Sequence, residues 1–161
     1  MRIVLLVVGK TTNTYLQNLI TDYQNRLKHY VSFDLQVIPE LKNAKHLSIE
    51  MQKEKEGECI LKQLEDANDI ILLDEKGTQF SSVDFAQHID KAQVNGKKKI
   101  LFVIGGPYGF SEQIYQKATQ KISLSKMTFS HQMIRLIFVE QLYRAFTILN
   151  NEPYHHELGN N

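Results

Sequence analysis

Short apolar runs alternate along this chain with longer segments whose apolar residues recur at helical spacing. The first run, residues 3–8, is rich in β-branched side chains and ends at Gly9, a pattern typical of a strand covered on both faces of a parallel sheet. In residues 33–37, apolar Phe33, Leu35 and Val37 instead alternate with polar residues, and Pro39 follows. This pattern predicts an edge strand. Further strands are predicted at about 69–74, 100–104 and 122–124.

The helical segments fall between these strands, at about 15–27, 48–66, 81–95, 111–118 and 131–150. Ser48 and Ser81 stand where N-caps belong. Gly57 in a helix interior costs about 1 kcal/mol relative to alanine, so we expect something to pack closely against that face. Strands alternating with helices predict an α/β fold, a mostly parallel sheet flanked by helices, in one domain spanning residues 1–161.

Composition narrows the class of protein. With 161 residues, 42% hydrophobic and 23% charged, the chain is typical of a globular domain rather than a disordered one. Its apolar runs are too short to cross a bilayer, and residues 3–8 lead into polar Lys10 without a cleavage pattern, which favours a strand over a signal peptide. The single cysteine, Cys59, excludes an internal disulfide and fits a reducing compartment. We therefore expect a cytoplasmic protein.

Charge is divided unevenly along the chain. From Lys97 onward there are eight lysines and arginines against four acids, a net of +4, whereas the preceding 96 residues carry eleven against fourteen. Such asymmetry has two explanations: one face of the protein binds a polyanion, or the surface charges are simply scattered unevenly. A bias of this size would not alone hold RNA at physiological salt.

A glycine-rich turn follows the strand at 100–104. It reads Gly105-Gly106-Pro107-Tyr108-Gly109 and lies where ligands bind in open α/β sheets, at the carboxyl end of a strand. Ile104 breaks the dinucleotide spacing G-x-G-x-x-G, and no Gly-Lys-Ser/Thr follows for a Walker loop. The turn is either a ligand-binding loop or a plain tight turn.

The segment from Leu124 to His131 leads from the last strand into the final helix. It has small hydroxyls, one lysine and free backbone groups that could hold an adenine edge, although an ordinary connection has the same composition. Ser130 is placed to cap the helix that follows.

The final helix and the tail carry the remaining candidate chemistry. His131 with Arg135, and Glu140 with Arg144, are four residues apart and share a face; the second pair could also be a solvated ion pair. The helix is apolar nearly all round, which indicates either a homodimer interface or a central core helix. In the tail, Tyr154 and His155 suit a flipped base, a frayed terminus is the alternative, and the spacing supports no metal site.

Taken together, these segments resemble one family. In order they are Val7-Val8-Gly9-Lys10, Glu54-Lys55-Glu56-Gly57-Glu58, Phe102-Val103-Ile104-Gly105-Gly106, Leu124-Ser125-Lys126-Met127-Thr128-Phe129, His131 with Arg135, Glu140-Gln141-Leu142-Tyr143-Arg144-Ala145 and Pro153-Tyr154-His155. The chain is similar over almost its whole length to the ribosomal RNA large subunit methyltransferase H family. This is a minimal group of the SPOUT superfamily that methylates N3 of a pseudouridine in 23S ribosomal RNA.

The resemblance implies a C-terminal trefoil knot, which pattern rules alone would not suggest because knots are nearly absent from proteins. It also implies a homodimer that acts on the assembled ribosome and binds S-adenosyl-L-methionine within about residues 70–161. The expected cofactor-binding residues are Leu73, Gly105, Leu124, Ser125, Lys126, Met127, Thr128 and Phe129. Relatives have arginine after the Tyr-His of the tail, whereas this chain has His156, which leaves the role of that position in question.

For catalysis we expect Arg135 or Arg144 to favour the deprotonated imide of the base, while Tyr154 and His155 hold it. Alignment of N3 with the methyl carbon is the main task, and positioning of this kind can contribute about 7–11 kcal/mol. Two rival interpretations are a ribosome-binding module that keeps a vestigial pocket and a flavodoxin-like nucleotide binder. Neither explains why the glycine turn and the 124–129 segment occur together.

Overall fold

A computed structural model describes residues 1–156, so residues 157–161 of the predicted domain lie outside the described part. The elements follow in the order β1 (Arg2–Val8), α1 (Thr14–Leu27), β2 (Ser32–Ile38), the 3₁₀ turn η1 (Ala44–His46), α2 (Ile49–Leu61), β3 (Asp69–Gln79), α3 (Ser82–Val94), β4 (Lys99–Ile104), α4 (Glu112–Lys117), β5 (Gln120–Ser123) and α5 (Met133–Leu149). The sheet has the order β2-β1-β4-β3-β5, and every paired strand is parallel. The predicted parallel α/β fold is confirmed, with β2 at an edge.

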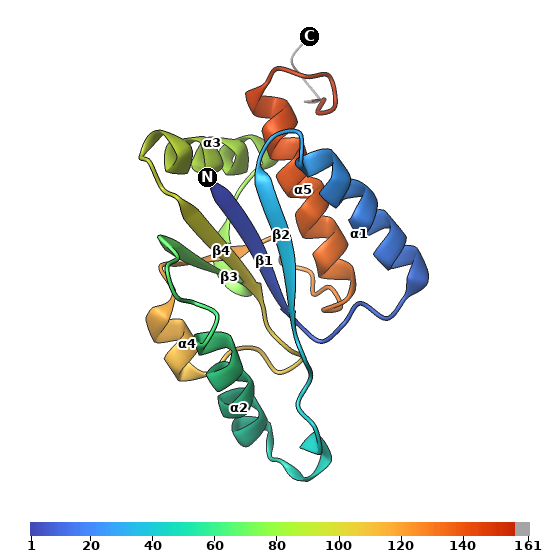
Figure 1. Cartoon of the computed structure of the whole chain (residues 1–161), viewed down its shortest axis with the longest axis vertical. Coiled ribbons are helices and arrows are strands. Elements are labelled where there is room, and N and C mark those ends of the chain that lie inside the picture. The colour runs from blue at the N-terminus through green and yellow to red at the C-terminus, as the bar shows by residue number, and fades with distance from the viewer. Residues whose placement is uncertain (157–161) are drawn as a thin grey trace.

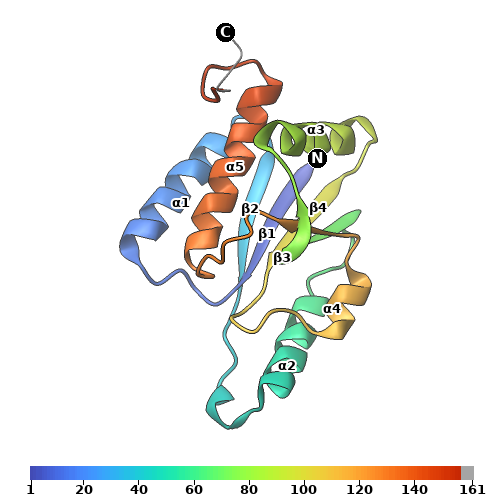
Figure 2. The same cartoon turned by 180° about the vertical axis from the view of Figure 1, so that it is seen from behind.

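The helices cover both faces of this sheet. Alternate residues of β1, namely Ile3, Leu5 and Val7, pack in the core formed with α1, α3 and α5, while Val4, Leu6 and Val8 pack in the core on the side of α2 and α4. Figures 1 and 2 show α5 between α1 and α3, and α2 beside α4. Residues 3–7 are almost completely buried, as expected for a strand covered on both faces.

The α2 helix confirms one packing prediction and ends earlier than expected. A Cβ at Gly57 would lie 2.4 Å from the Ser111 Oγ at the start of α4, so the close packing expected at this glycine is real. Ser48 and Ser81 accept hydrogen bonds from the backbones of Met51 and Asp84, as predicted N-caps should. The predicted helix to about residue 66 ends instead at Leu61, and the chain turns where Asp66 adopts a positive φ of 63°.

The β3 strand is longer than its apolar run and bends around β5. Leu73 and Thr78 both align with Ile122 of β5, so the four residues between them leave the ladder as a bulge. A Cβ at Gly77 would lie 2.6–2.7 Å from backbone atoms of Lys121 and Ile122. Only glycine allows this approach without displacing backbone, and the bulge carries Asp74 and Glu75 to the carboxyl edge of the sheet.

None of the helices between residues 1 and 156 has the length and apolar character needed to span a membrane.

Candidate active site

A cavity of about 680 Å³ lies at the carboxyl ends of β3, β4 and β5. Its walls are the β3 bulge (73–76), the glycine turn with the end of β4 (104–110), Tyr115 of α4, the end of β5 with most of the following segment (123–131), Ile134 of α5 and Lys53 of α2. This size falls in the range of small-molecule and cofactor sites, and the position is the one where open parallel sheets bind ligands.

The glycine turn is folded back on itself at the mouth of β4. Gly106 and Gly109 form an isolated antiparallel bridge, and Gly109 has a φ of 83°. A Cβ at Gly105 would lie 3.0 Å from the Phe110 ring, so the buried Phe110 closes the turn from below. The predicted Gly105 therefore lines the cavity as a bare backbone surface that a ligand can approach closely.

The segment after β5 forms the opposite wall and is held by its own hydroxyls. Ser123 Oγ donates to the Ser125 carbonyl at 2.9 Å, and Ser125 Oγ accepts from the Met127 amide at 2.9 Å. Thr128 Oγ1 donates to Glu75 Oε2 at 3.0 Å, which ties this segment to the β3 bulge. Ser130 Oγ accepts from the Met133 amide, confirming it as the cap of α5.

Seven of the eight predicted cofactor-binding residues line this single cavity: Leu73, Gly105, Leu124, Ser125, Met127, Thr128 and Phe129. The eighth, Lys126, is exposed and is not among the lining residues. Leu73, Ile104, Leu124 and Ile134 give the cavity apolar surface, whereas Asp74 and Glu75 contribute carboxylates and Lys53 an ammonium group. The arrangement fits a ligand with a flat apolar part and a cationic part.

Sequence reasoning missed the acidic side of the cavity. The Tyr115 hydroxyl donates to Asp74, and burial first, then this hydrogen bond, raises the pKa of Tyr115. Asp74 follows directly after a buried strand, and this position alone could have identified it as a candidate. Glu75 and Tyr115 have no comparable signal, because only the bulge and the docking of α4 bring them to the cavity.

Arg135 does not reach the cavity. Its side chain is completely buried and donates to the His131 carbonyl (3.0 Å), Thr11 Oγ1 (3.0 Å) and the Val8 carbonyl (2.9 Å). Burial lowers the pKa of Arg135, with Glu40 acting in the opposite direction. The guanidinium thus joins the end of β1 and the loop after it to the start of α5, while His131 itself lines the cavity.

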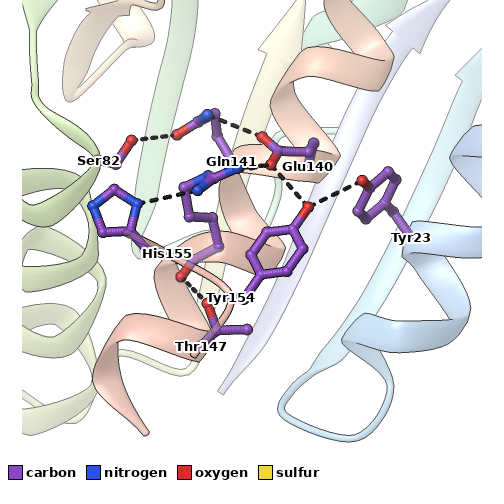
Figure 3. A network of polar contacts seen from close by, with 8 residues as sticks. Tyr23, Ser82, Glu140, Gln141, Thr147, Tyr154 and His155 are labelled. Atoms are coloured by element: carbon purple, nitrogen blue, oxygen red, sulfur yellow. Dashed lines mark hydrogen bonds and ion pairs between the residues drawn. The ribbon is translucent and has the colours of Figure 1, made fainter. Parts of the chain in front are cut away.

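The other predicted catalytic residues lie together at the far end of α5 (Figure 3). Arg144 donates to Glu140 Oε1 through Nη2 (2.6 Å) and Nε (3.1 Å), and to His155 Nδ1 through Nη1 (3.1 Å). The Tyr154 hydroxyl donates to the same Glu140 oxygen at 3.0 Å and lies 3.1 Å from the Tyr23 hydroxyl. Burial, followed by contacts with Tyr23 and Glu140, raises the pKa of Tyr154, so its hydroxyl stays protonated.

These contacts tie the described part of the tail, up to His155, to the body of the molecule. Glu152 accepts from the Tyr30 hydroxyl through both oxygens, and this hydrogen bond is the main reason that the pKa of Tyr30 is raised to about 12. The Arg144 guanidinium also lies 4.8 Å from the centroid of the Tyr154 ring. The Glu140–Arg144 pair is therefore partly buried and shared within a network, rather than a solvated ion pair.

Neither Arg144 nor Tyr154 nor His155 lines the cavity. One chain thus carries two separate groups of candidate residues. We call them the donor pocket, after the methyl donor that the resemblance implies (the cavity residues 73–76, 104–110, 123–125 and 127–131), and the tail cluster (Tyr23, Glu140, Arg144, Tyr154 and His155). Within residues 1–156, no group of three or more histidine, cysteine or acidic side chains is placed to hold a metal ion.

Comparison with known proteins agrees with this architecture. The family described as "Predicted SPOUT methyltransferase" matches residues 1–155, which defines the chain as a methyltransferase of the SPOUT class. Proteins named "Ribosomal RNA large subunit methyltransferase H" from Parabacteroides distasonis and Phocaeicola vulgatus are 59% and 61% identical over 157 residues, covering 98% of this chain and 100% of each relative. The chain belongs to this methyltransferase H family, as the resemblance predicted.

Solved structures show the same fold at low sequence identity. The "Probable Methyltransferase from Bordetella pertussis Tohama I" has a TM-score of 0.55 at 8% identity and covers 90% of this chain and 96% of its own. A "probable methylase family protein from Haemophilus influenzae Rd KW20" has a TM-score of 0.53 at 15% identity and covers 93% of this chain and 66% of its own.

Proposed function

We propose that this chain methylates N3 of a pseudouridine in 23S ribosomal RNA, with S-adenosyl-L-methionine as methyl donor and the assembled ribosome as substrate. The observation that carries the proposal is the donor pocket, in which the glycine turn and the segment after β5 face one cavity. The names of the relatives at 59–61% identity support large-subunit ribosomal RNA as the target. A ribosomal substrate also implies a cytoplasmic protein.

The donor pocket fits the proposed donor in size, shape and charge. Apart from Lys53, all its lining residues fall between 73 and 134. Leu73, Leu124 and Phe129 would hold the adenine between apolar surfaces, and the backbone of Gly105 would allow close approach. The carboxylates of Asp74 and Glu75 suit the positively charged part of the molecule. When bound, the donor supplies a methyl group on a cationic sulfur, an electrophile that needs no further activation.

A homodimer would unite the two groups of residues. The donor pocket and the tail cluster are separate within one chain, so a complete site requires the tail cluster of a second copy. Exposed apolar residues lie on α1 and at the start of α5: Tyr15 is 81% exposed, Leu19 47% and Met133 40%. Met127 and Phe129 at the pocket itself are also exposed. Apolar surface of this kind is typical of an interface.

In the tail cluster, Arg144 is the better candidate for stabilising the imide anion. The guanidinium nitrogens of both arginines are hydrogen-bonded, but Arg135 is fully buried, whereas Arg144 is partly exposed and adjoins Tyr154 and His155. Glu140 is unsuited to be the proton acceptor, because both its oxygens already accept hydrogen bonds. Its role would be to hold Arg144 and Tyr154 in place.

The contact with Arg144 fixes how His155 can act. An arginine nitrogen only donates, so His155 Nδ1 must accept and the proton of the neutral ring is on Nε2. His155 would therefore donate to a carbonyl oxygen of the base instead of removing the N3 proton. Negative charge that develops on the imide would be stabilised by this donor and by Arg144, and the proton would leave to solvent.

A C-terminal trefoil knot remains part of the proposal. Its support is the β3 bulge: residues 73 and 78 align with the same residue of β5, and Gly77 contacts the β5 backbone. β3 thus stays paired with β5 on both sides of the bulge, which is compatible with a threaded C-terminal segment. The knot would also place the segment after β5 opposite the glycine turn.

The test compares ribosomal RNA from cells with and without this protein by mass spectrometry. The proposal predicts that one pseudouridine of 23S RNA loses one methyl group, and that the purified protein restores it on ribosomes but not on naked RNA. An unchanged modification pattern would refute the activity, and binding to ribosomes without affinity for S-adenosylhomocysteine would favour the vestigial module. Replacing Tyr154 and His155 with alanine should abolish single-turnover methylation while cofactor affinity stays near the wild-type value.

A further inference from the structure

A buried carboxylate on α2 lies directly beneath the glycine turn. Glu56 is only 8% exposed, and a Cβ at Gly106 would lie 2.5 Å and 2.9 Å from its two carboxylate oxygens. Among residues 1–156, no lysine or arginine forms an ion pair with it. A buried carboxylate without a cationic partner costs stability, which indicates that it is kept for another reason.

The contacts of Glu56 are directed at the turn. Gln52 Nε2 donates to Glu56 Oε2 at 3.4 Å, and the backbone of Gly106 lies against the carboxylate. Burial raises the pKa of Glu56, and the adjoining Gln52 and Gly106 backbone act in the opposite direction. Gly106 itself lines the donor pocket, but Glu56 does not. The carboxylate thus supports the wall of the pocket from behind.

We propose that Glu56 is a positioning residue that holds the Gly105–Gly106 turn in the shape the methyl donor requires. The inference rests on the proposed donor pocket and adds to it a residue outside the cavity. Glycine is needed at 106 because the carboxylate occupies the space of a side chain there, and the carboxylate in turn fixes where the backbone of the turn can lie. The two residues therefore act as a unit.

The test uses the full-length protein and S-adenosylhomocysteine, whose binding can be measured by calorimetry without RNA. Glu56→Ala should weaken binding about tenfold or more, while Glu56→Gln, which keeps an oxygen acceptor of the same shape, should stay within about threefold of wild type. In methylation assays Glu56→Ala should raise the KM for S-adenosylmethionine with little change in kcat. Glu58→Ala, an exposed carboxylate on the same helix, is the matched control and should change nothing.

A second pair of variants keeps the inference testable if Glu56→Ala folds poorly. Gly106→Ala should displace the carboxylate and weaken binding as Glu56→Ala does, and the double variant should be no weaker than either single one, because a single contact is lost. The inference would be overturned if the losses of affinity of the two single variants multiplied in the double variant. It would also be overturned if a folded Glu56→Ala protein bound S-adenosylhomocysteine as tightly as wild type. Absence of binding by the wild-type protein would instead refute the donor pocket, and the inference with it.

Discussion

Replacing two arginines of α5 one at a time should separate an effect on stability from an effect on activity. Arg135 is fully buried and makes three hydrogen bonds to neutral oxygens of β1, the loop after it and the segment before α5. Arg144 keeps 24% of its side chain exposed and adjoins the tail cluster. We expect replacement of Arg135 by alanine to unfold the protein at a lower temperature, and replacement of Arg144 to abolish methylation without this loss.

The size of each effect follows from the contacts. Arg135→Ala leaves one buried and two partly buried oxygens without their donor and creates a cavity, a loss of about 3–5 kcal/mol. For a chain of this length each kcal/mol corresponds to roughly 2–4 °C, so the melting temperature should fall by roughly 6–20 °C. Arg144→Ala removes a partly exposed ion pair with Glu140 and a hydrogen bond to His155, which together contribute about 1–2 kcal/mol. If Arg144 stabilises the imide anion as proposed, its loss should lower kcat about 100-fold or more.

Calorimetric unfolding at one fixed protein concentration measures the first effect, since a dimer's melting temperature depends on concentration. Single-turnover methylation of ribosomes measures the second. Arg135→Lys is the conservative control. Because one ammonium group cannot replace the three hydrogen bonds of the guanidinium, this variant should also have a lower melting temperature than wild type. The reasoning is refuted if Arg135→Ala melts within about 2 °C of wild type while its turnover collapses, because Arg135 would then act in the chemistry.

Three further predictions concern the sheet, the turn and the interface. Gly77→Ala should destabilise the protein by about 3 kcal/mol or more, because the added Cβ would meet the β5 backbone. Gly96→Ala has open space but a φ of 73°, so it should cost only about 1 kcal/mol. Equal losses of stability in thermal unfolding would contradict the close contact between the β3 bulge and β5. Burial raises the pKa of Glu56 above 4.5, while Gln52, Gly106, Glu40 and His131 act on it as neighbours. The wild-type protein should therefore lose stability relative to Glu56→Gln as the pH rises from about 4 through that raised pKa. A difference in melting temperature between the two proteins that does not change with pH would contradict the burial argument. Combined Tyr15→Glu and Leu19→Lys changes should convert a dimer into monomers that still bind S-adenosylhomocysteine, as sedimentation would show; an unchanged mass would place the interface elsewhere.

The sequence pattern predicted the sheet well and its irregular part poorly. The buried strands are continuous apolar runs, which leave little choice of structure. The extension of β3 was missed because Asp74–Gly77 are polar and contain a glycine, as a loop does. Its position is set by contact with β5, which is a long-range interaction that no local pattern reveals.

For the site, local sequence identified residues but not where their side chains point. The i, i+4 spacing of His131 and Arg135 suggested a shared functional face, yet His131 lines the cavity while Arg135 is buried. Lys126 lies within the predicted binding segment but is exposed. Glu56 was noticed only as part of the family resemblance, because its role depends on the docking of α2 against the glycine turn. α5, which is apolar nearly all round, is a central core helix within the single chain. A dimer interface stays a prediction.

In the proposed dimer, the donor pocket of one chain works with the tail cluster of another. Subunit complementation tests it directly: a variant with a blocked pocket, Gly105→Leu, is mixed and refolded or co-expressed with one lacking Tyr154 and His155. Random pairing would make half the dimers mixed, each with one intact site, so about one quarter of wild-type methylation should return. Activity no greater than that of the two inactive variants measured separately would show that each site is built from a single chain.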